Sequence, residues 1–283
     1  MKAKNKRLIV TPPVYLVLPV YNSAKFLTAA LTSLAQQTYP HWQLYALDDG
    51  SHDQSWELLQ DFANQRPSNQ VHLIRQQKNQ GLVKSLNRLL KALPTSNNAF
   101  VARFDADDLM TVDRLEKQVA FLLTHPKVDL LGSAYRLIDQ YDQPGSIVRH
   151  YRSPLFLQKA LLFYNPLAHP TLMWRQDWQN RVQLQYQADF PHCEDYATWL
   201  TLAPQTTFAN LSRPLLYYRQ HSDQVSTKNL RLQTKYTQFL SKQAQKNFLA
   251  SLSDPTLQNL AQNIIDSPLP KTIKIFLLTC FFN

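Results

Sequence analysis

The stretch "AFVARFDADD", residues 99–108, places three aspartates within four positions directly after an apolar run. The run is typical of a strand that is buried on both faces of a sheet. Carboxylates this close repel one another, so Asp105, Asp107 and Asp108 require an explanation. Turn formation or capping of a following helix accounts for one or two of them. A divalent cation, which prefers oxygen ligands, accounts for all three. On this stretch alone both explanations remain open.

A regular alternation of strands and helices extends over about the first 130 residues. We expect strands at 14–18, 43–47, 71–75 and 99–104, and helices at 22–37, 54–63 and 82–93. In the first helix, Leu27, Ala30 and Leu31 fall at the i, i+3 and i+4 positions of one apolar face. This alternation predicts an α/β fold with a mostly parallel, twisted sheet and helices on both faces.

Polar side chains follow three of these strands at the point where each strand ends. They are the turn "PVYN" at 19–22, the pair Asp48 and Asp49, and the cluster at 105–108. Open α/β sheets bind their ligands outside the carboxyl ends of the strands. The sequence therefore predicts a site for a cation and a nucleotide at this edge of the sheet.

The second half of the chain is less regular. We expect strands at 171–175, 206–212 and 215–219, and a helix at 194–203 with Glu194 and Asp195 in its first turn. The last 55 residues read as helical, with no obvious place in the sheet.

Composition limits the classes of partner and the compartment. The net charge of +10 indicates an anionic partner, which is a nucleotide, a nucleic acid or a lipid surface. Two cysteines form no disulfide framework and are typical of a reducing compartment. Pro12 and Pro13 interrupt the apolar N-terminal run, which is too short for a signal peptide or a membrane span. Only four glycines occur, and they form neither a dinucleotide fingerprint nor a phosphate-binding loop.

An ordered set of motifs resembles the family 2 glycosyltransferases of the GT-A fold. The motifs are "LPVYN…DDGSHDQS" (18–55), "NQGL" (79–82), "ARFDADD" (102–108), "DRLEKQV" (113–119), "NPLAHPTLMWR" (165–175), "CEDYATWLTLA" (193–203) and "ANLSRPLLYYRQHSDQVS" (209–226). A single D-x-D is weak, because it occurs by chance in many proteins. The ordered set covers roughly three quarters of the chain and is specific.

This resemblance implies an inverting glycosyltransferase that uses a nucleotide-diphosphate sugar, a UDP-sugar by our expectation. The transferred group would be a hexosyl or N-acetylhexosaminyl unit. The acceptor would be a hydroxyl of a glycan or of a lipid-linked sugar, in assembly of a bacterial surface polysaccharide. The implied cofactor is Mn²⁺ or Mg²⁺.

The same resemblance assigns roles to individual residues. Asp105 and Asp107 would hold the cation and the donor, and His221 would approach the cation. Pro19 and Tyr21 would lie near the nucleotide base, and Asp49 would contact it. Asp195 would be the catalytic base, and the supporting residues would be Asp48, Asp108 and Glu194. Simpler roles exist for several residues. Asp49 could serve its turn, Tyr21 could pack, and the Glu194–Asp195 pair could only stabilise a helix start. We expect His169 to be structural, and Lys84 and Arg88 to lie on a solvated helix face.

The chemistry needs these residue types. A departing diphosphate concentrates negative charge, and a divalent cation neutralises that charge as the bond breaks. A sugar hydroxyl needs a base, and we expect the dipole of the helix to keep Asp195 ionised for that task.

The tail carries a second signal. Lys228, Arg231, Lys235, Lys242 and Lys246 share one face of a predicted helix, beside Leu232, Tyr236, Phe239 and Leu240. This pattern is typical of a helix at an anionic membrane surface, and the alternative is packing of its apolar side on the domain. No nucleic-acid recognition motif accompanies the charge. We therefore expect a cytoplasmic protein that binds the inner face of the cell membrane through 228–283.

The expected organisation is a GT-A domain at 1–226 and a helical extension at 227–283. Within the domain, 14–133 forms the nucleotide-binding half and 134–226 the half with the acceptor and the base. Two rival functions remain. A sugar-1-phosphate nucleotidyltransferase would carry a Gly-rich loop after its first strand, where this chain has "PVYN". An inactive glycan- or membrane-binding module would not need Asp105, Asp107 and Asp195.

Overall fold

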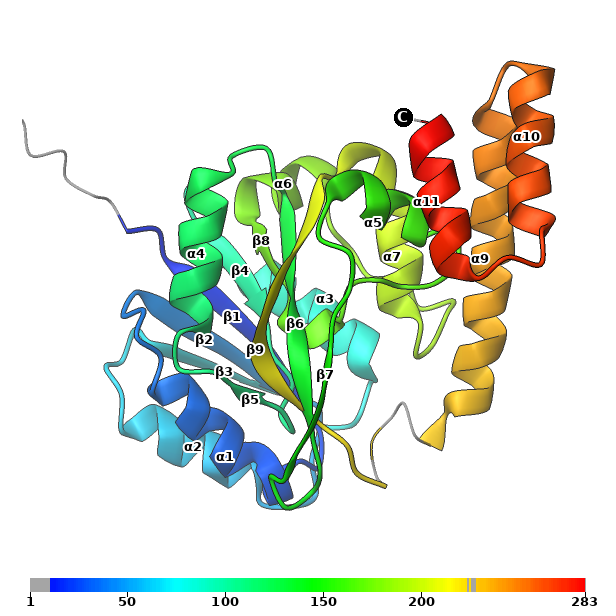
Figure 1. The fold of residues 1–283 in the computed structure, drawn as a ribbon. Coiled ribbons are helices and arrows are strands. Elements are labelled where there is room, and N and C mark those ends of the chain that lie inside the picture. The colour runs from blue at the N-terminus through cyan, green and yellow to red at the C-terminus, as the bar shows by residue number, and fades with distance from the viewer. Residues whose placement is uncertain (1–10, 223, 225–227, 283) are drawn as a thin grey trace, which may run out of the picture.

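The computed structural model describes residues 11–222, 224 and 228–282. In this part of the chain a single nine-stranded sheet forms the centre of the molecule, with helices on both of its faces (Figure 1). The strands are β1 (Val14–Val20), β2 (Trp42–Asp48), β3 (Val71–Arg75), β4 (Phe100–Arg103), β5 (Leu109–Met110), β6 (Leu130–Ile138), β7 (Pro144–Val148), β8 (Met173–Arg175) and β9 (Phe208–Arg219). The α/β fold expected from the alternation is confirmed.

The helices follow the strands closely in sequence. They are α1 (Ala24–Ala35), α2 (Ser55–Asn64), α3 (Leu82–Ala92), α4 (Arg114–Thr124), α5 (Pro154–Ala160), α6 (Gln176–Val182), α7 (Glu194–Leu202), α9 (Leu230–Ser251), α10 (Pro255–Asp266) and α11 (Lys271–Phe281). The helices expected in the first half begin and end within about two residues of α1, α2 and α3.

The sheet has two differently built halves. Its strand order is β3-β2-β1-β4-β8-β6-β9-β5, with β7 paired to β6. Strands β1 to β4 run parallel to one another, as the alternation predicts. In the second half, β8 is antiparallel to β4 and β6, and β5 and β7 add antiparallel edges. The carboxyl ends of β1, β2 and β4 therefore meet at one edge of the sheet.

Two apolar clusters cover the two faces of the sheet. Because successive side chains of a strand alternate between faces, Leu16 and Leu18 of β1 pack with α1, α2 and α4. Tyr15 and Val17 point to the opposite face and pack with α3, α6 and α7. This double burial explains why β1 reads as a continuous apolar run.

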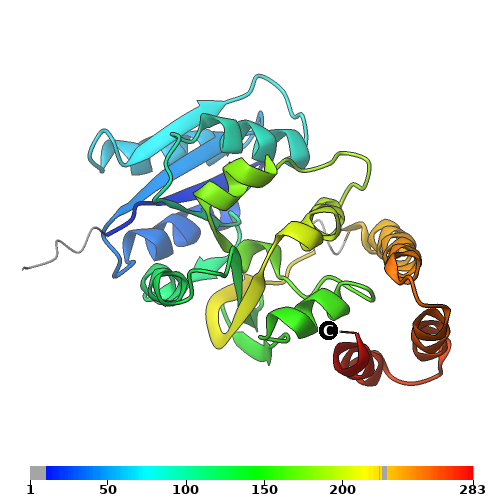
Figure 2. The same ribbon diagram turned by 90° about the horizontal axis from the view of Figure 1, so that it is seen from above.

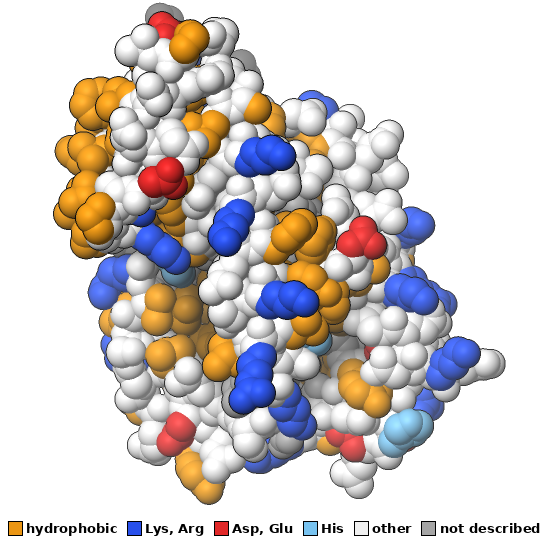
Figure 3. All heavy atoms as spheres, turned by 90° about the vertical axis from the view of Figure 1, so that its right-hand side faces the viewer, with side chains coloured by type: hydrophobic (Ala, Val, Ile, Leu, Met, Phe, Trp, Pro, Cys, Tyr) orange, Lys and Arg blue, Asp and Glu red, His pale blue; other side chains and the backbone are white. Residues whose placement is uncertain are grey.

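The C-terminal helices stand beside the sheet domain at one end of the molecule (Figure 2). Helix α9 packs against α7, while α10 and α11 join α5 in a third apolar cluster. Figure 3 shows Lys and Arg side chains down this face, with hydrophobic side chains gathered toward its upper left. Among the described residues, no helix combines the length and apolarity needed to cross a bilayer.

Candidate active site

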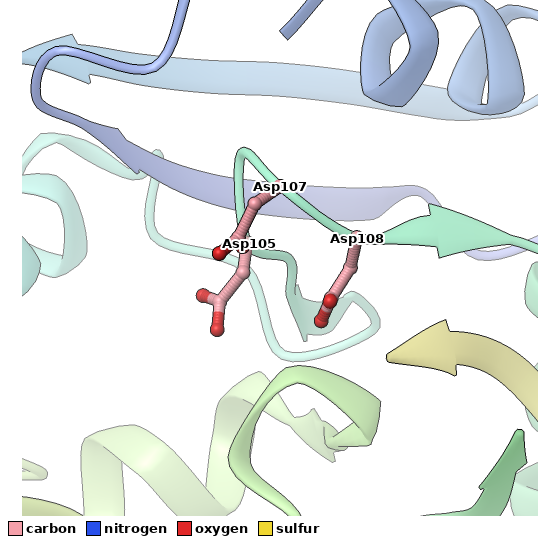
Figure 4. A group of neighbouring side chains, drawn as sticks. All are labelled: Asp105, Asp107 and Asp108. Carbon is pink, nitrogen blue, oxygen red and sulfur yellow. The ribbon is translucent and has the colours of Figure 1, made fainter. Parts of the chain in front are cut away.

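The three aspartates of the opening stretch occupy the short loop between β4 and β5. Their side chains point to the same side of this loop (Figure 4). One carboxylate oxygen from each of Asp105, Asp107 and Asp108 lies within 4.8 Å of the others. The structure thus forms the cluster that the sequence predicts.

Each of these carboxylates has a different environment. Asp105 forms an ion pair with the buried Arg103. Asp107 Oδ2 lies 3.0 Å from Nε2 of His221. Asp108 Oδ1 accepts a hydrogen bond of 2.9 Å from the backbone N–H of Arg219, while its buried Oδ2 has no hydrogen-bond partner. Asp108 therefore fastens β9 to the loop and leaves one oxygen free.

The cluster fits a divalent cation. Burial raises the pKa of Asp105, and burial together with Asp107 and Asp105 raises the pKa of Asp108 well above its usual value. Positive charge placed among these oxygens would relieve both effects. An all-oxygen donor set suits Mg²⁺ or Mn²⁺. Asp105 and Asp107 would hold the ion, with the Asp108 oxygen behind them.

A cavity of about 500 Å³ joins this cluster to the first turn of α7. Of the residues singled out from the sequence, it is lined by Pro19, Tyr21, Asp105, Asp107, His169, Glu194, Asp195 and His221. The turn after β1, the loop after β4 and the start of α7 are far apart in sequence. Their convergence on one cavity is the geometry that a two-substrate reaction requires.

The surroundings of Asp195 act on its pKa in opposite directions. It lies in the first turn of α7, and its Oδ2 accepts a hydrogen bond of 2.8 Å from Nδ2 of Asn165. Burial, followed by the nearby charge of Glu194, raises the pKa of Asp195 to about 7. Burial and Glu194 thus oppose the ionisation of Asp195 that we expect from the helix dipole. A carboxyl with this pKa is well matched to general base work near neutral pH.

The pair after β2 is buried beside the cavity and does not line it. Asp48 accepts a hydrogen bond of 3.3 Å from the N–H of Ser51 and so stabilises the turn. Asp49 is 3% exposed, and its carboxylate accepts hydrogen bonds from the Gln76 side chain and from the N–H groups of residues 80 and 81. Contact of Asp49 with a nucleotide base stays a prediction.

Three further basic residues occupy the positions expected of them. His169 Nε2 lies 2.8 Å from the hydroxyl of Tyr186, and burial lowers the pKa of His169 well below its usual value. His169 borders the cavity, and its structural role stays a prediction. Lys84 and Arg88 are exposed on α3 and do not line the cavity.

The sequence reasoning missed several residues of the cavity. Lys25, Arg103, Tyr135, His150 and Asn165 all line it. Asn165 is the first residue of the motif "NPLAHP", and a polar residue within such a motif could have been predicted to line the cavity. Tyr135 lies on β6, a strand that was not predicted, so no pattern pointed to it.

Comparison with known proteins agrees with this geometry. An O-antigen biosynthesis glycosyltransferase, WbnJ of Escherichia coli, is 28% identical over 246 residues, covering 83% of this chain and 92% of WbnJ. The amylovoran biosynthesis glycosyltransferase AmsE of Erwinia amylovora is 30% identical over 217 residues, covering 74% of this chain and 77% of AmsE. The chain spans 68% of the length of an uncharacterized glycosyltransferase of Haemophilus influenzae and 32% of the length of the bifunctional glycosyltransferase pgtA of Dictyostelium discoideum.

Solved structures share the fold. The S. aureus TarS fragment 1-349 in complex with UDP superposes with a TM-score of 0.63 at 19% identity, covering 96% of this chain and 71% of the fragment. The mannosyltransferase PcManGT of Pyrobaculum calidifontis, in complex with GDP-Man and Mn²⁺, gives a TM-score of 0.56 at 16% identity, covering 96% and 85%. The model of the family "Glycosyl transferase family 2" matches residues 15–175, and the chain belongs to this family of glycosyltransferases.

Proposed function

We propose that this glycosyltransferase moves a hexosyl or N-acetylhexosaminyl unit from a UDP-sugar to an acceptor hydroxyl, with inversion at the anomeric carbon. The observation that carries this proposal is the shared cavity. It places a cluster of carboxylates suited to a cation opposite Asp195, a carboxyl whose pKa is about 7. One side of the cavity can hold the leaving diphosphate, and the other can take a proton.

The donor side consists of the turn after β1 and the aspartate loop. Pro19 and Tyr21 border the end of the cavity that we assign to the base, and Tyr21 is 44% exposed and open to stacking. We assign Asp105 and Asp107 to a Mn²⁺ or Mg²⁺ ion, which when bound neutralises the charge of the diphosphate. His221, 3.0 Å from Asp107, fixes that carboxylate and faces the same charge. The UDP and GDP-Man–Mn²⁺ complexes of the two structural neighbours support a nucleotide donor and a divalent cation.

The acceptor side consists of the start of α7 and the loop before η1 (His169–Thr171). Asp195 would remove the proton of the attacking hydroxyl, and Asn165 holds the carboxylate in place through its hydrogen bond. Glu194 is itself buried, and its charge raises the pKa of Asp195 toward neutrality. One base opposite the leaving group favours a single displacement, which inverts the anomeric centre.

We assign the acceptor to a surface polysaccharide or its lipid-linked precursor. The names of the relatives support this, since WbnJ and AmsE are named for O-antigen and amylovoran biosynthesis. We further propose that residues 228–283 hold the protein against the anionic inner face of the cell membrane. Residues 228–282 carry seven Lys or Arg and two Asp, which is half of the net charge of +10.

A screen of donors tests the proposal. Thermal shifts with Mn²⁺ and a panel of UDP-sugars and GDP-mannose should show stabilisation by one UDP-sugar above the rest. Slow hydrolysis of that donor should follow and should stop in EDTA. Stabilisation without hydrolysis would indicate an inactive binding module. Release of inorganic diphosphate from UTP and a sugar 1-phosphate would indicate the rival nucleotidyltransferase.

A further inference from the structure

A second cavity, of about 650 Å³, lies outside the active site, between α5, α7 and α9. Its lining is mainly apolar and includes Leu161, Leu200, Phe190, Phe239, Leu240 and Phe248. Its size is typical of a site for a small molecule. We refer to it as the α7–α9 groove.

The groove follows the same two helices that border the active site. Helix α7 carries Asp195 in its first turn, and Thr201 lines the groove six residues later, about 9 Å along the helix axis. Helix α9 contributes Gln233 to the active-site cavity and Gln243 to the groove, about 15 Å further along. Phe190 lines the groove, with its ring 6.0 Å from that of Phe239. Because these linings are about 9 Å apart along α7 and about 15 Å apart along α9, an extended molecule is long enough to span them.

Positive charge borders this apolar surface. Lys242 and Lys246 are exposed on α9, one helical turn from the groove-lining positions 239 and 243. Lys159 lies in the wall, with Nζ 4.6 Å from the centre of the Phe248 ring. Burial lowers the pKa of Lys159, and an anion beside it would oppose that shift. None of the described lining residues is acidic. In Figure 3 this face shows Lys and Arg among hydrophobic side chains.

We propose that the α7–α9 groove binds the apolar chain of a lipid-linked diphosphate acceptor. The glycan of that acceptor then extends from the groove to Asp195, and its diphosphate lies near the lysines of the rim. Burial of a linear hydrocarbon in the groove supplies affinity that the exposed sugar alone does not provide. This inference rests on the proposed glycosyl transfer and names the acceptor of that reaction.

Calorimetry with farnesyl diphosphate tests the groove directly. The full chain is first saturated with UDP and Mn²⁺, so that the diphosphate of the probe does not enter the donor site. Farnesyl diphosphate should bind, and inorganic diphosphate should not displace it. Thr201→Trp, which fills the groove from its exposed rim, should weaken binding by about tenfold or more. Gln243→Trp, from the α9 side, should act in the same way, and Thr124→Trp on α4 is the matched control.

Two double Lys→Gln variants test the role of the lysines at the rim of the groove. The double variant Lys242→Gln and Lys246→Gln should bind farnesyl diphosphate more weakly than the unaltered chain does. The control, with the exposed pair Lys117→Gln and Lys127→Gln, should bind it with unchanged affinity. The affinity for farnesol, which lacks the diphosphate, should be the same in both double variants and in the unaltered chain. The groove is excluded if folded protein does not bind farnesyl diphosphate, or if both Trp variants bind it with unchanged affinity. Displacement by dihexanoyl phosphatidylglycerol at equal concentration would contradict an acceptor site and indicate a membrane-lipid site.

Titration with UDP separates this inference from the proposed function. All groove variants should bind UDP as the unaltered chain does, because they lie outside the donor side of the cavity. A chain that binds farnesyl diphosphate in the groove but does not bind UDP would refute the proposed donor and leave the groove standing.

Discussion

At the scale of single residues, the neighbours of Asp195 act in opposite directions on its pKa. Burial and Glu194 raise it, while the hydrogen bond from Asn165 lowers it. The active form of a general base is deprotonated, so activity should be present above about pH 7 and lost as the pH falls through that value. Substitution of Glu194 and substitution of Asn165 should therefore shift the pKa of Asp195 in opposite directions.

We predict that Glu194→Gln shifts the acidic limb of the pH–rate profile to lower pH, because it removes a negative charge beside Asp195. Asn165→Ala should shift the same limb to higher pH, because it removes a hydrogen bond that favours the ionised form. Profiles of kcat/KM for the two variants check this. Shifts in the same direction, or no shift in either, would show that the acidic limb belongs to another group.

The aspartate loop gives a second prediction at this scale. Asp107→Asn should lower metal-dependent binding of UDP by about tenfold or more while the protein stays folded, because a carboxamide is a weaker ligand for a divalent cation. The exposed Asp61→Asn on α2 is a matched control. Calorimetry with and without Mn²⁺ measures it, and Asp107→Asn protein with unchanged Mn²⁺ dependence would remove Asp107 from the cation site.

Residue types and motif order predicted most of the acidic residues of the cavity. The sequence could not predict the pKa of Asp195, because that value depends on burial and on Asn165, 30 positions away. It also placed Asp49 at the base, whereas the structure gives its carboxylate three partners from the chain itself. Partners of this kind depend on loop packing that no local pattern contains.

At the scale of elements, local sequence patterns predicted the parallel half of the sheet and, in the other half, the strands of β8 and β9, but they did not predict β5, β6 and β7. Strand β9 was expected as two strands, at 206–212 and 215–219, with Pro214 between them. The structure carries one strand through Pro214, with a shift of register opposite residues 133–135 of β6. Strand β6 pairs with residues about 80 positions later, and pairing over such distances has no local signal.

The turn after β2 allows an element-scale prediction of stability. Gly50 has φ +73°, and a Cβ there would lie 2.7 Å from the carbonyl carbon of Lys78. Gly81 has φ +90° with open space around it. Both Gly→Ala variants should lose on the order of 1–2 kcal/mol from backbone strain, and Gly50→Ala should lose more because of the added clash. Urea unfolding measures the free energy of unfolding of both variants. Equal losses would show that the backbone at 78–79 moves to accommodate the added Cβ at no cost.

At the scale of the whole molecule, helix α9 of the tail packs on the domain with one side and exposes a row of basic side chains on another. The apolar side of α9 packs on the domain through Tyr236 and Leu240. The basic residues 231, 235, 242 and 246 of α9, and Lys228 just before it, stay exposed. Exposed apolar side chains lie on both helices: Phe239 of α9 is 55% exposed, and on α11 Phe276 is 53% and Phe281 is 56% exposed. The division into 1–226 and 227–283 stays a prediction.

We predict that the full chain binds anionic vesicles and that binding falls as salt screens the lysines. Phe276→Ser with Phe281→Ser should weaken binding several-fold, because less apolar surface enters the interface. Leu123→Ser on α4, which is 51% exposed, is the control. Vesicle sedimentation measures it, and a chain that ignores anionic vesicles at low salt would disprove membrane contact.

The account depends most on Asp195 as the base of a single displacement, and the single-turnover rate of Asp195→Asn tests it most directly. The variant keeps the shape of the side chain and cannot accept a proton, while Asp105 and Asp107 are untouched. With bound donor and acceptor, transfer should fall by about two to four orders of magnitude, with unchanged affinity for UDP and Mn²⁺. The product formed by the unaltered chain should show an inverted anomeric coupling by NMR. A variant rate near that of the unaltered chain, or a retained configuration, would contradict the account.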